Sequence, residues 1–330
     1  MKKFKKDVTF IDLFAGIGGF RQALESYGAK CIFSSEKDKF ACKSYEANYG
    51  DVPSGDITKI KNEEIPKHNI LCAGFPCQPF SVSGNQRGFE DSRGTLFFEI
   101  ARIAEYHKPE ILFLENVSNL KKHDDENTLN TMVKVLKDMQ YDVYIGLMNA
   151  SDFNVPQSRK RIYFVCFKNN LNVDTFKFPE PVECTTFLND ILLPDSETSE
   201  YIINRPDMQI KDIEITQCQS KPIRIGTINK GGQGDRIYSP VGHAITLSAQ
   251  GGGAGAKTGA YLVNGKVRKL APRECALVQG FPKDFKIIVS DNQAYKQFGN
   301  SVAVPVLKVI VNKIVELKQL ENFTYDCNKK

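Results

Sequence analysis

The sequence has no tryptophan, only four histidines, and no pair of cysteines with CxxC spacing. Its nine cysteines are an odd number and lie mostly in apolar surroundings, which argues against a disulfide framework or a zinc site. We therefore expect a cytoplasmic protein with reduced thiols and no bound metal. No stretch approaches the roughly 18 to 20 apolar residues of a membrane span. The basic N-terminus, MKKFKKDVTF, lacks the apolar region of a signal peptide.

Charge is distributed unevenly along the chain. Residues 221–300 contain 12 Lys and Arg against 4 Asp and Glu, whereas the remainder is slightly acidic. The same segment holds 13 of the 24 glycines. A basic, glycine-rich segment on a slightly acidic body indicates a module that binds a polyanion, attached to a separate catalytic body. Charge alone leaves a solvated basic face as the alternative.

Short apolar runs alternate with amphipathic segments through the first half of the chain. We expect strands at 8–14, 31–35, 70–73, 111–114, 143–147 and 161–167, and helices at 20–27, 39–49, 94–106 and 128–139. This alternation predicts an α/β fold with a doubly wound, mostly parallel sheet, which binds ligands beyond the carboxyl ends of its strands. After Phe178 the alternation stops, and we expect a strand-like run at 243–248 and helices at 272–279 and 302–320.

A glycine turn follows the first expected strand. The stretch FIDLFAGIGGF, residues 10–20, contains Gly16, Gly18 and Gly19, which allow a tight turn and let a ligand approach the next helix. Their spacing differs from GxGxxG, which argues against a nicotinamide cofactor. Glu36, interpreted as following the second strand, is suited to bind a ribose hydroxyl pair, and Asp56 is interpreted as following the next strand end. The sequence therefore predicts a cofactor that contains a nucleoside.

Cys77 lies in the stretch GFPCQPFS, residues 74–81, just beyond the third expected strand. A free cysteine is most often a small buried hydrophobe, and Cys72, inside that strand, fits this description. Cys77 instead lies in a turn stiffened by Pro76 and Pro79, whose amides could stabilise a thiolate. Apart from His68, no histidine lies within 25 residues of it, so a local Cys–His pair of the protease type is not evident. Cys77 is thus a candidate nucleophile.

Two further strand ends carry charged residues. In LFLENV, residues 112–117, Glu115 ends an apolar strand, where partial desolvation should raise its pKa toward the range useful for proton donation. In PQSRKRIYFV, residues 156–165, Arg159 and Arg161 alternate before a strand and suit an anionic or carbonyl ligand. The alternatives are a glutamate that caps a turn and a pair of surface charges.

Taken together and in this order, these stretches resemble the motifs of the DNA (cytosine-5)-methyltransferases. The resemblance rests on FxGxGG, the acidic end of the second strand, GFPCQPFS, ENV, QxRxR at 157–161 and QFGNSV at 297–302, and it spans nearly the whole chain. It implies S-adenosyl-L-methionine as cofactor and S-adenosyl-L-homocysteine as product. It also implies a Rossmann-like catalytic domain (1–189 plus 300–330), a smaller, mainly β target-recognition domain (190–271) and a hinge (272–299).

The resemblance also implies roles for individual residues. Cys77 would add to carbon-6 of a flipped-out cytosine, Glu115 would bind ring N3 and the amine, Arg161 would hold the ring carbonyl, and Arg159 would support the site. The implied cofactor-binding residues are Phe14, Gly16, Gly18, Gly19, Glu36, Asp56, Ile57, Pro76, Leu96, Asn300 and Ser301. The implied DNA-binding residues are Ser81, Ser83, Arg93, Gln233, Arg236, Thr246, Gly252 and Gly253.

The segment KGGQGDRIYS, residues 230–239, with AITLSAQGGG after it, is similar to the target-recognition region of a GCGC-specific member of the family. This implies double-stranded DNA as substrate, with the inner cytosine of GCGC or a related site as target. It also implies a monomeric, nucleoid-associated bacterial enzyme with a separate cognate restriction endonuclease. An RNA (tRNA) cytosine-5 methyltransferase and a catalytically inactive DNA-binding module are the rival interpretations.

The sequence departs from the family pattern at one position. Members usually have a bulky aromatic residue, often tryptophan, after the ribose-binding carboxylate, where it packs on the adenine. This chain has Lys37 there. We therefore expect weaker binding of S-adenosylmethionine than in close relatives.

Overall fold

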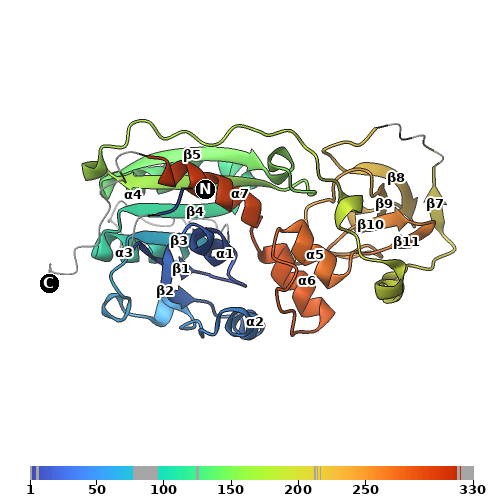
Figure 1. Cartoon of the computed structure of the whole chain (residues 1–330), viewed down its shortest axis with the longest axis horizontal. Helices are drawn as coiled ribbons and strands as arrows, with labels where there is room; N and C mark the ends of the chain where they lie inside the picture. Colours follow the sequence, from blue (N-terminus) through green and yellow to red (C-terminus); the bar gives the residue numbers. More distant parts are fainter. Residues whose placement is uncertain are drawn as a thin grey trace.

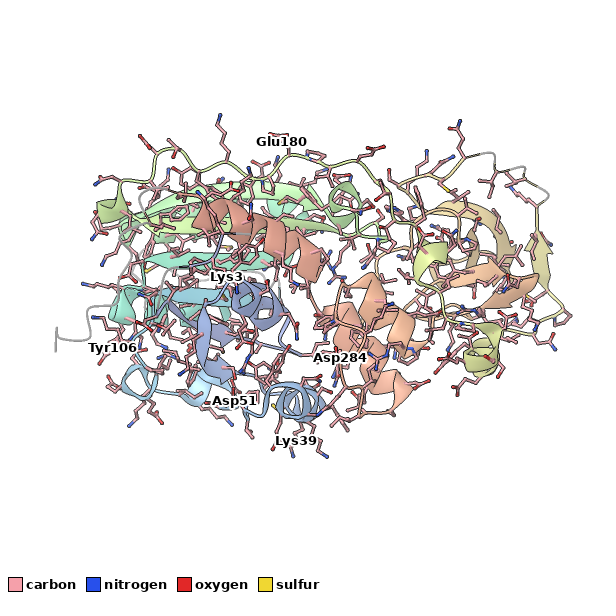
Figure 2. All side chains as sticks on the ribbon, viewed as in Figure 1. Lys3, Lys39, Asp51, Tyr106, Glu180 and Asp284 are labelled. Carbon is pink, nitrogen blue, oxygen red and sulfur yellow. The ribbon has the colours of Figure 1, made fainter. Side chains whose placement is uncertain are left out.

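The computed structural model describes residues 2–4, 7–76, 96–123, 126–211, 213, 215, 217–317 and 320. In this part of the chain, a large lobe carries the first half of the sequence and a smaller lobe carries a second sheet, with helices α5 and α6 between them (Figure 1). Side chains fill the space between the ribbons of both lobes, while the labelled Lys39 and Glu180 point outward at opposite edges of the large lobe (Figure 2).

The large lobe is built on one six-stranded sheet of order β2-β1-β3-β4-β6-β5. Its strands are β1 (Thr9–Leu13), β2 (Lys30–Ser35), β3 (Ile70–Gly74), β4 (Ile111–Val117), β5 (Tyr141–Asn149) and β6 (Lys160–Lys168). Strands β2, β1, β3 and β4 are parallel, whereas β6 is antiparallel to both β4 and β5. The predicted α/β fold is confirmed. The reversed edge was not predicted, because a short apolar run does not reveal strand direction.

Helices cover both faces of this sheet. Helices α1 (Gly19–Ser26) and α7 (Val304–Val315) share one apolar core with β1, β3 and β4, and α3 (Leu96–His107) and α4 (Asn127–Asp138) share the core on the other face. Helix α2 (Lys39–Tyr49) follows β2. Because side chains alternate along a strand, Phe10 packs toward α1 and α7 while Ile11 and Leu13 pack toward α3. Each such buried side chain stabilises the fold by about 1.5–3 kcal/mol.

The smaller lobe is a five-stranded sheet of order β11-β10-β9-β8-β7. Its strands are β7 (Met208–Ile210), β8 (Ile223–Ile228), β9 (Arg236–Ser239), β10 (Ala260–Val263) and β11 (Lys266–Arg268), and α5 (Pro272–Val278) and α6 (Asp291–Asn300) follow. One apolar core joins both lobes, since it contains Ile17, Tyr238, Tyr261 and Phe298. The predicted domain boundaries and the hinge at 272–299 stay a prediction.

Short 3-10 helices connect these elements. They are η1 (Ile57–Lys59), η2 (Asn62–Glu64), η3 (Ser118–Lys122), η4 (Ala150–Phe153), η5 (Asn169–Leu171), η6 (Leu188–Ile191), η7 (Asp195–Glu197), η8 (Ser199–Tyr201) and η9 (Gln233–Asp235).

Three sequence-based expectations need correction. The run 243–248 is not a strand, since its one bridge joins Ala244 to Gln157. The helix expected from 302 begins only at Val304, because Pro305 fixes a first helical turn there, and it ends at Val315. The segment Asp291–Val315 is also long and apolar enough to span a membrane, which the prediction missed. It is two core helices, α6 and α7, interrupted at residues 301–303.

Candidate active site

Strand direction brings the predicted charged residues to one edge of the large sheet. Glu115 lies near the carboxyl end of β4, next to Gly74 at the end of β3. Since β6 is antiparallel, its beginning lies at the same edge, where Arg161 pairs with Val117 of β4. The reversed strand, unexpected from the sequence, is therefore what places an arginine beside the strand-end glutamate.

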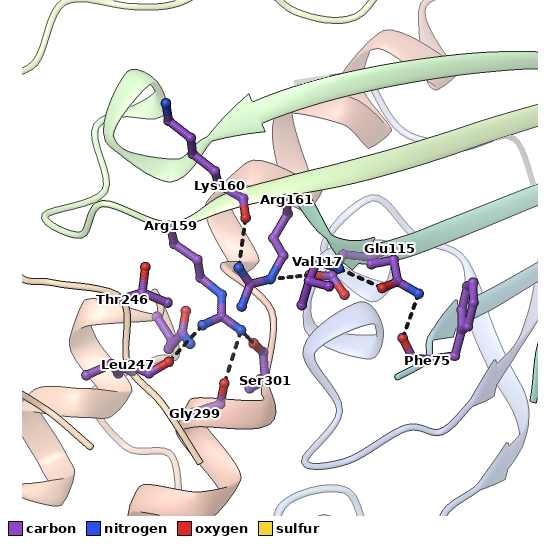
Figure 3. Close-up of polar contacts among 12 residues, drawn as sticks. Phe75, Glu115, Val117, Arg159, Lys160, Arg161, Thr246, Leu247, Gly299 and Ser301 are labelled. Atoms are coloured by element: carbon purple, nitrogen blue, oxygen red, sulfur yellow. Dashed lines mark hydrogen bonds and ion pairs between the residues drawn. The ribbon is translucent and has the colours of Figure 1, made fainter. Parts of the chain in front are cut away.

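Glu115 and Arg161 form a buried ion pair at this edge (Figure 3). Arg161 Nε lies 3.0 Å from Glu115 Oε1, and the two side chains are only 13% and 9% exposed. Burial raises the pKa of the Glu115 carboxyl, and the positive charges of Arg161 and Arg159 partly oppose that rise. The prediction of a desolvated glutamate is confirmed. Its catalytic role stays a proposal.

Arg159 makes a different set of contacts. Its guanidinium donates to the main-chain carbonyls of Leu247 (3.2 Å), Gly299 (3.1 Å) and Ser301 (Figure 3). Desolvation, with the nearby charge of Arg161, lowers the pKa of this buried group to about 9. Because these donors are occupied by carbonyls, we do not retain the interpretation that both arginines face one ligand. Arg159 instead joins the start of β6 to Leu247 and to the end of α6.

Asn116 also belongs to this site. It lies in the ENV motif, but the sequence alone predicted no role for it. It is 1% exposed, and its Nδ2 donates to the Phe75 carbonyl at 2.9 Å. Its Oδ1 accepts from its neighbour Val117 N. This amide thereby fixes the main chain just before Pro76. The predicted residues Cys77, Ser81, Ser83 and Arg93 lie outside the described part of the chain.

The glycine turn forms an open cradle at the ends of β1 and β2. Phe14 and Gly16 both have φ of 55°, and a Cβ on Gly16 would meet no atom within 4 Å. Glu36 accepts from Gly16 N at 2.9 Å and from Asp38 N at 2.7 Å, so its carboxylate is held at the rim of this turn. The open space at Gly16, beside half-buried Phe14 and a fixed carboxylate, fits a nucleoside cofactor.

Gly18 and Gly19 have a structural reason to be glycine. A Cβ on Gly18, whose φ is 83°, would overlap the Tyr49 ring, and one on Gly19 would overlap Val302. These two positions set how closely α1 approaches α2 and the segment before α7. The structure thus separates Gly16, which borders open space, from two glycines required by packing.

The other predicted cofactor residues differ in exposure. Pro76 and Asn300 are exposed, Leu96 and Ser301 are half-buried, and Ile57 is only 2% exposed.

The sequence suggested that Asp56 follows a strand, and this is wrong. Asp56 lies after α2 and caps η1, where hydrogen bonds from Thr58 lower the pKa of its carboxyl. Lys37 is exposed beside Glu36.

A buried polar network, which sequence reasoning missed, connects the two lobes. Gln157 Oε1 accepts from Leu247 N at 3.1 Å, and its Nε2 lies 3.2 Å from Gln279 Oε1. Gln279 in turn donates to the Phe298 carbonyl at 2.6 Å. Gln157 and Gln279 are both fully buried. With Arg159, this network holds the main chain of Leu247 next to the start of β6.

The predicted DNA-contacting residues of the small lobe lie at its surface. Gln233, Thr246, Gly252 and Gly253 are exposed, and Arg236, the first residue of β9, is half-buried. Thr246 donates to the Ser158 carbonyl, two residues before Lys160 at the start of β6. Among the residues that the structure describes, no three His, Cys, Asp or Glu side chains cluster as metal ligands would.

Comparison with known proteins assigns a family to this arrangement. The profile of the C-5 cytosine-specific DNA methylases matches residues 8–316. The chain is 56% identical over 307 residues to the type II methyltransferase M.HhaI of Haemophilus parahaemolyticus, covering 93% of this chain and 94% of that protein. It is 43% identical to M.HpaII of Haemophilus parainfluenzae, covering 94% and 90%.

A solved structure shows the same fold. The S. pombe Dnmt2 methyltransferase superposes with a TM-score of 0.71 at 19% identity, covering 94% of this chain and 99% of that one. The chain belongs to the C-5 cytosine-specific DNA methylases, enzymes that take their methyl group from S-adenosylmethionine.

Proposed function

We propose that this chain is the modification enzyme of a type II restriction–modification system and methylates the inner cytosine of GCGC in double-stranded DNA. The segment KGGQGDRIYS and the identity to a type II methyltransferase support this specificity. The observation that carries the chemistry is the buried Glu115–Arg161 pair, which lies on strand ends adjacent to the Phe75 carbonyl held by Asn116.

Cytosine carbon-5 is a poor nucleophile, and the proposed catalytic residues address that difficulty. The Cys77 thiolate adds to carbon-6, which gives carbon-5 the electron density of an enamine. Glu115, kept protonated more readily by burial, donates a proton to ring N3 or hydrogen-bonds it as charge develops. Arg161 holds the ring carbonyl oxygen. Once carbon-5 carries the methyl group, it loses its proton to solvent and N3 returns its proton to Glu115. The electron pair left at carbon-5 then expels the Cys77 thiolate and restores the aromatic ring.

S-adenosylmethionine supplies the methyl group that carbon-5 receives. Gly16 leaves the space for its nucleoside, and the Glu36 carboxylate, fixed by two main-chain amides, is available to its ribose hydroxyls. The adenine would contact half-buried Phe14, and Ser301, which follows α6, would contact the cofactor as well.

A cytosine inside a duplex cannot reach these groups, so the base must be flipped out at a cost of a few kcal/mol. We assign to exposed Gln233 the pairing with the orphaned guanine, and to half-buried Arg236 the reading of a guanine edge. A bidentate contact of that kind discriminates against a wrong base by about 1–3 kcal/mol.

Mapping 5-methylcytosine in a methylation-free host that expresses the chain tests this proposal. Methylation of the inner cytosine of GCGC is expected, and methylation at another sequence would contradict the target while leaving the chemistry intact. The rival RNA function is tested in the same cells by bisulfite sequencing of tRNA. Modified tRNA without modified DNA would favour that rival.

A further inference from the structure

The two exposed loops of the small lobe are locked to each other by main-chain contacts. Gly255 N donates to the Gly234 carbonyl at 2.8 Å, joining the loop that contains η9 to the loop at residues 249–256. A Cβ on Gly234 would overlap the Gly252 carbonyl oxygen, so the two backbones are too close for a side chain at this position. Gly234 has no positive φ, so this closeness is the reason for glycine there.

One side chain completes the lock. Asp235 Oδ1 accepts from Ala254 N at 2.9 Å, across 19 residues of sequence. Gly253, with φ of 93°, has no side chain to collide with this oxygen: a Cβ there would lie 2.6 Å from Asp235 Oδ1. Three contacts, which we together call the loop clamp, join the two loops: Gly234–Gly255, Gly234–Gly252 and Asp235–Ala254.

The outer sides of the clamped loops are free. Gln233, Gly252 and Gly253 are exposed, and Asp235 is half-buried between them. Each loop is also anchored at its base: β8 pairs with β9 at Arg236, and Ser248 N donates to the Lys257 carbonyl. The clamp therefore sets the position of one exposed loop tip relative to the other, which the anchors alone do not fix.

We propose that Asp235 is a specificity-determining positioning residue, whose carboxylate holds the two DNA-reading loops in one register through the loop clamp. This rests on the proposed DNA methyltransferase function. A readout of several base pairs by two loops needs their contacts at fixed separation, because displacement by about 1 Å breaks hydrogen-bond geometry. Releasing the clamp should then admit near-cognate sites as well as weaken binding to the cognate site.

The chain offers matched variants to test this. Asp235→Ala removes the acceptor, whereas Asp235→Asn keeps an oxygen that can accept from Ala254. Gly234→Ala forces the backbones apart without touching the carboxylate. Gly232→Ala, in the same loop, places its Cβ at an ordinary 3.7 Å from the nearest atom and is its control. Asp207→Ala, at an exposed pair with Arg205 in the same lobe, controls for Asp235→Ala.

The experiment measures kcat/KM of each full-length variant on duplexes with the cognate site and with each single base-pair change, together with Tm. Asp235→Ala and Gly234→Ala should lower the ratio of cognate to near-cognate kcat/KM by about tenfold or more, the value of one well-placed base contact. Asp235→Asn, Gly232→Ala and Asp207→Ala should keep the wild-type ratio. Hydrogen exchange at residues 250–256 should accelerate in Asp235→Ala, which reports release of the loop directly.

The proposal is overturned if Asp235→Ala and Gly234→Ala lose activity equally on all sites with the ratio unchanged, since that indicates a merely structural role. It is also overturned if Asp235→Asn loses discrimination as Asp235→Ala does, since the charge rather than the acceptor would then matter. If the wild-type chain methylates DNA and either of these outcomes is found, the clamp proposal fails while the proposed function stands. A wild-type chain that methylates no DNA would overturn both.

Discussion

The edge of the large sheet and the loops of the small lobe are stabilised in opposite ways. At the sheet edge, charged and polar side chains are buried: Glu115 pairs with Arg161, and Arg159 donates to three carbonyls. In the small lobe, glycine backbones contact each other directly, and Gln233 and its neighbours remain exposed.

This difference suggests that reaction rate and sequence specificity depend on different parts of the molecule. Buried charged groups are costly to move, so they suit a site where the same chemistry is performed on every substrate base. In the loops of the small lobe, closely packed backbones fix the position of the loops. Their exposed side chains can be replaced without moving the backbone. Substitutions at the edge should therefore change rate, and substitutions in the loops should change specificity.

Replacing the buried carboxyl should have the largest effect. Glu115→Gln cannot donate a proton, so kcat should fall by about 10²–10⁴-fold while the set of methylated sites stays unchanged. Glu110→Gln is a matched control, because Glu110 directly precedes the same strand and burial also raises its pKa, but it lies at the opposite end. Single-turnover kinetics measure both. A Glu115→Gln enzyme within twofold of wild type would contradict the assigned role.

Arg159 lies where the two regions meet and should affect both. Arg159→Met keeps the side-chain volume but leaves the carbonyls of Leu247, Gly299 and Ser301 without their donor. The free energy of unfolding should fall by about 2–4 kcal/mol. Both cofactor affinity and discrimination between sites should decline. Chemical denaturation, with Arg205→Met at an exposed ion pair as control, measures the first effect. Loss of only one of the two functions would argue against a connecting role.

A second buried carboxyl of the large sheet makes stability depend on pH. Burial raises the pKa of Asp12 in β1 from 3.8 to about 8, with Arg21 opposing. Between these pKa values the folded chain keeps a proton that the unfolded chain has released. Stability therefore falls as pH rises through this window, by at most about 1.4 kcal/mol per pH unit.

The substitution Asp12→Asn removes this dependence. Its stability relative to wild type should increase steadily from pH 5 to pH 8, as measured by urea denaturation at several pH values. Asp138→Asn, at the exposed end of α4, should show no such trend. Parallel curves for Asp12→Asn and wild type would show that this carboxyl does not hold its proton.

The smallest expected effect concerns Lys37, an exposed position just after β2. Lys37→Trp adds an aromatic ring next to Glu36, and S-adenosylmethionine should bind about three- to tenfold more tightly, equivalent to about 0.5–1.5 kcal/mol. Lys39→Trp, two residues further on and also exposed, is the control. Calorimetric titration measures both. Equal affinity of Lys37→Trp and wild type would show that the missing aromatic ring is immaterial.

Local patterns made part of this structure predictable. Helix α2 was predicted with its correct bounds, since Asp38 caps its start and Gly50 its end. Burial of Glu115 followed from its place in an apolar strand. The run 243–248 was mistaken for a strand because it is extended and apolar, yet its hydrogen bonds go mainly to residues 156–159 in place of a ladder.

Other features depend on contacts that one stretch of sequence does not contain. Asn116 acts on Phe75, 41 residues away, and Gln157 meets Gln279 across 122 residues. Their sequence neighbours give no sign of these partners. The loop clamp is similar, because a glycine-rich segment predicts flexibility or close approach equally well until the second backbone is placed beside it.

The central claim is that Cys77 becomes covalently bonded to carbon-6 of the target cytosine. A GCGC duplex with 5-fluorocytosine at the inner position tests it directly, because fluorine blocks the proton loss that releases the enzyme. With S-adenosylmethionine present, we expect a stable protein–DNA adduct on the peptide that contains Cys77, and none with Cys77→Ser. A cofactor-bound enzyme that forms no adduct, or one attached through another residue, would contradict the account.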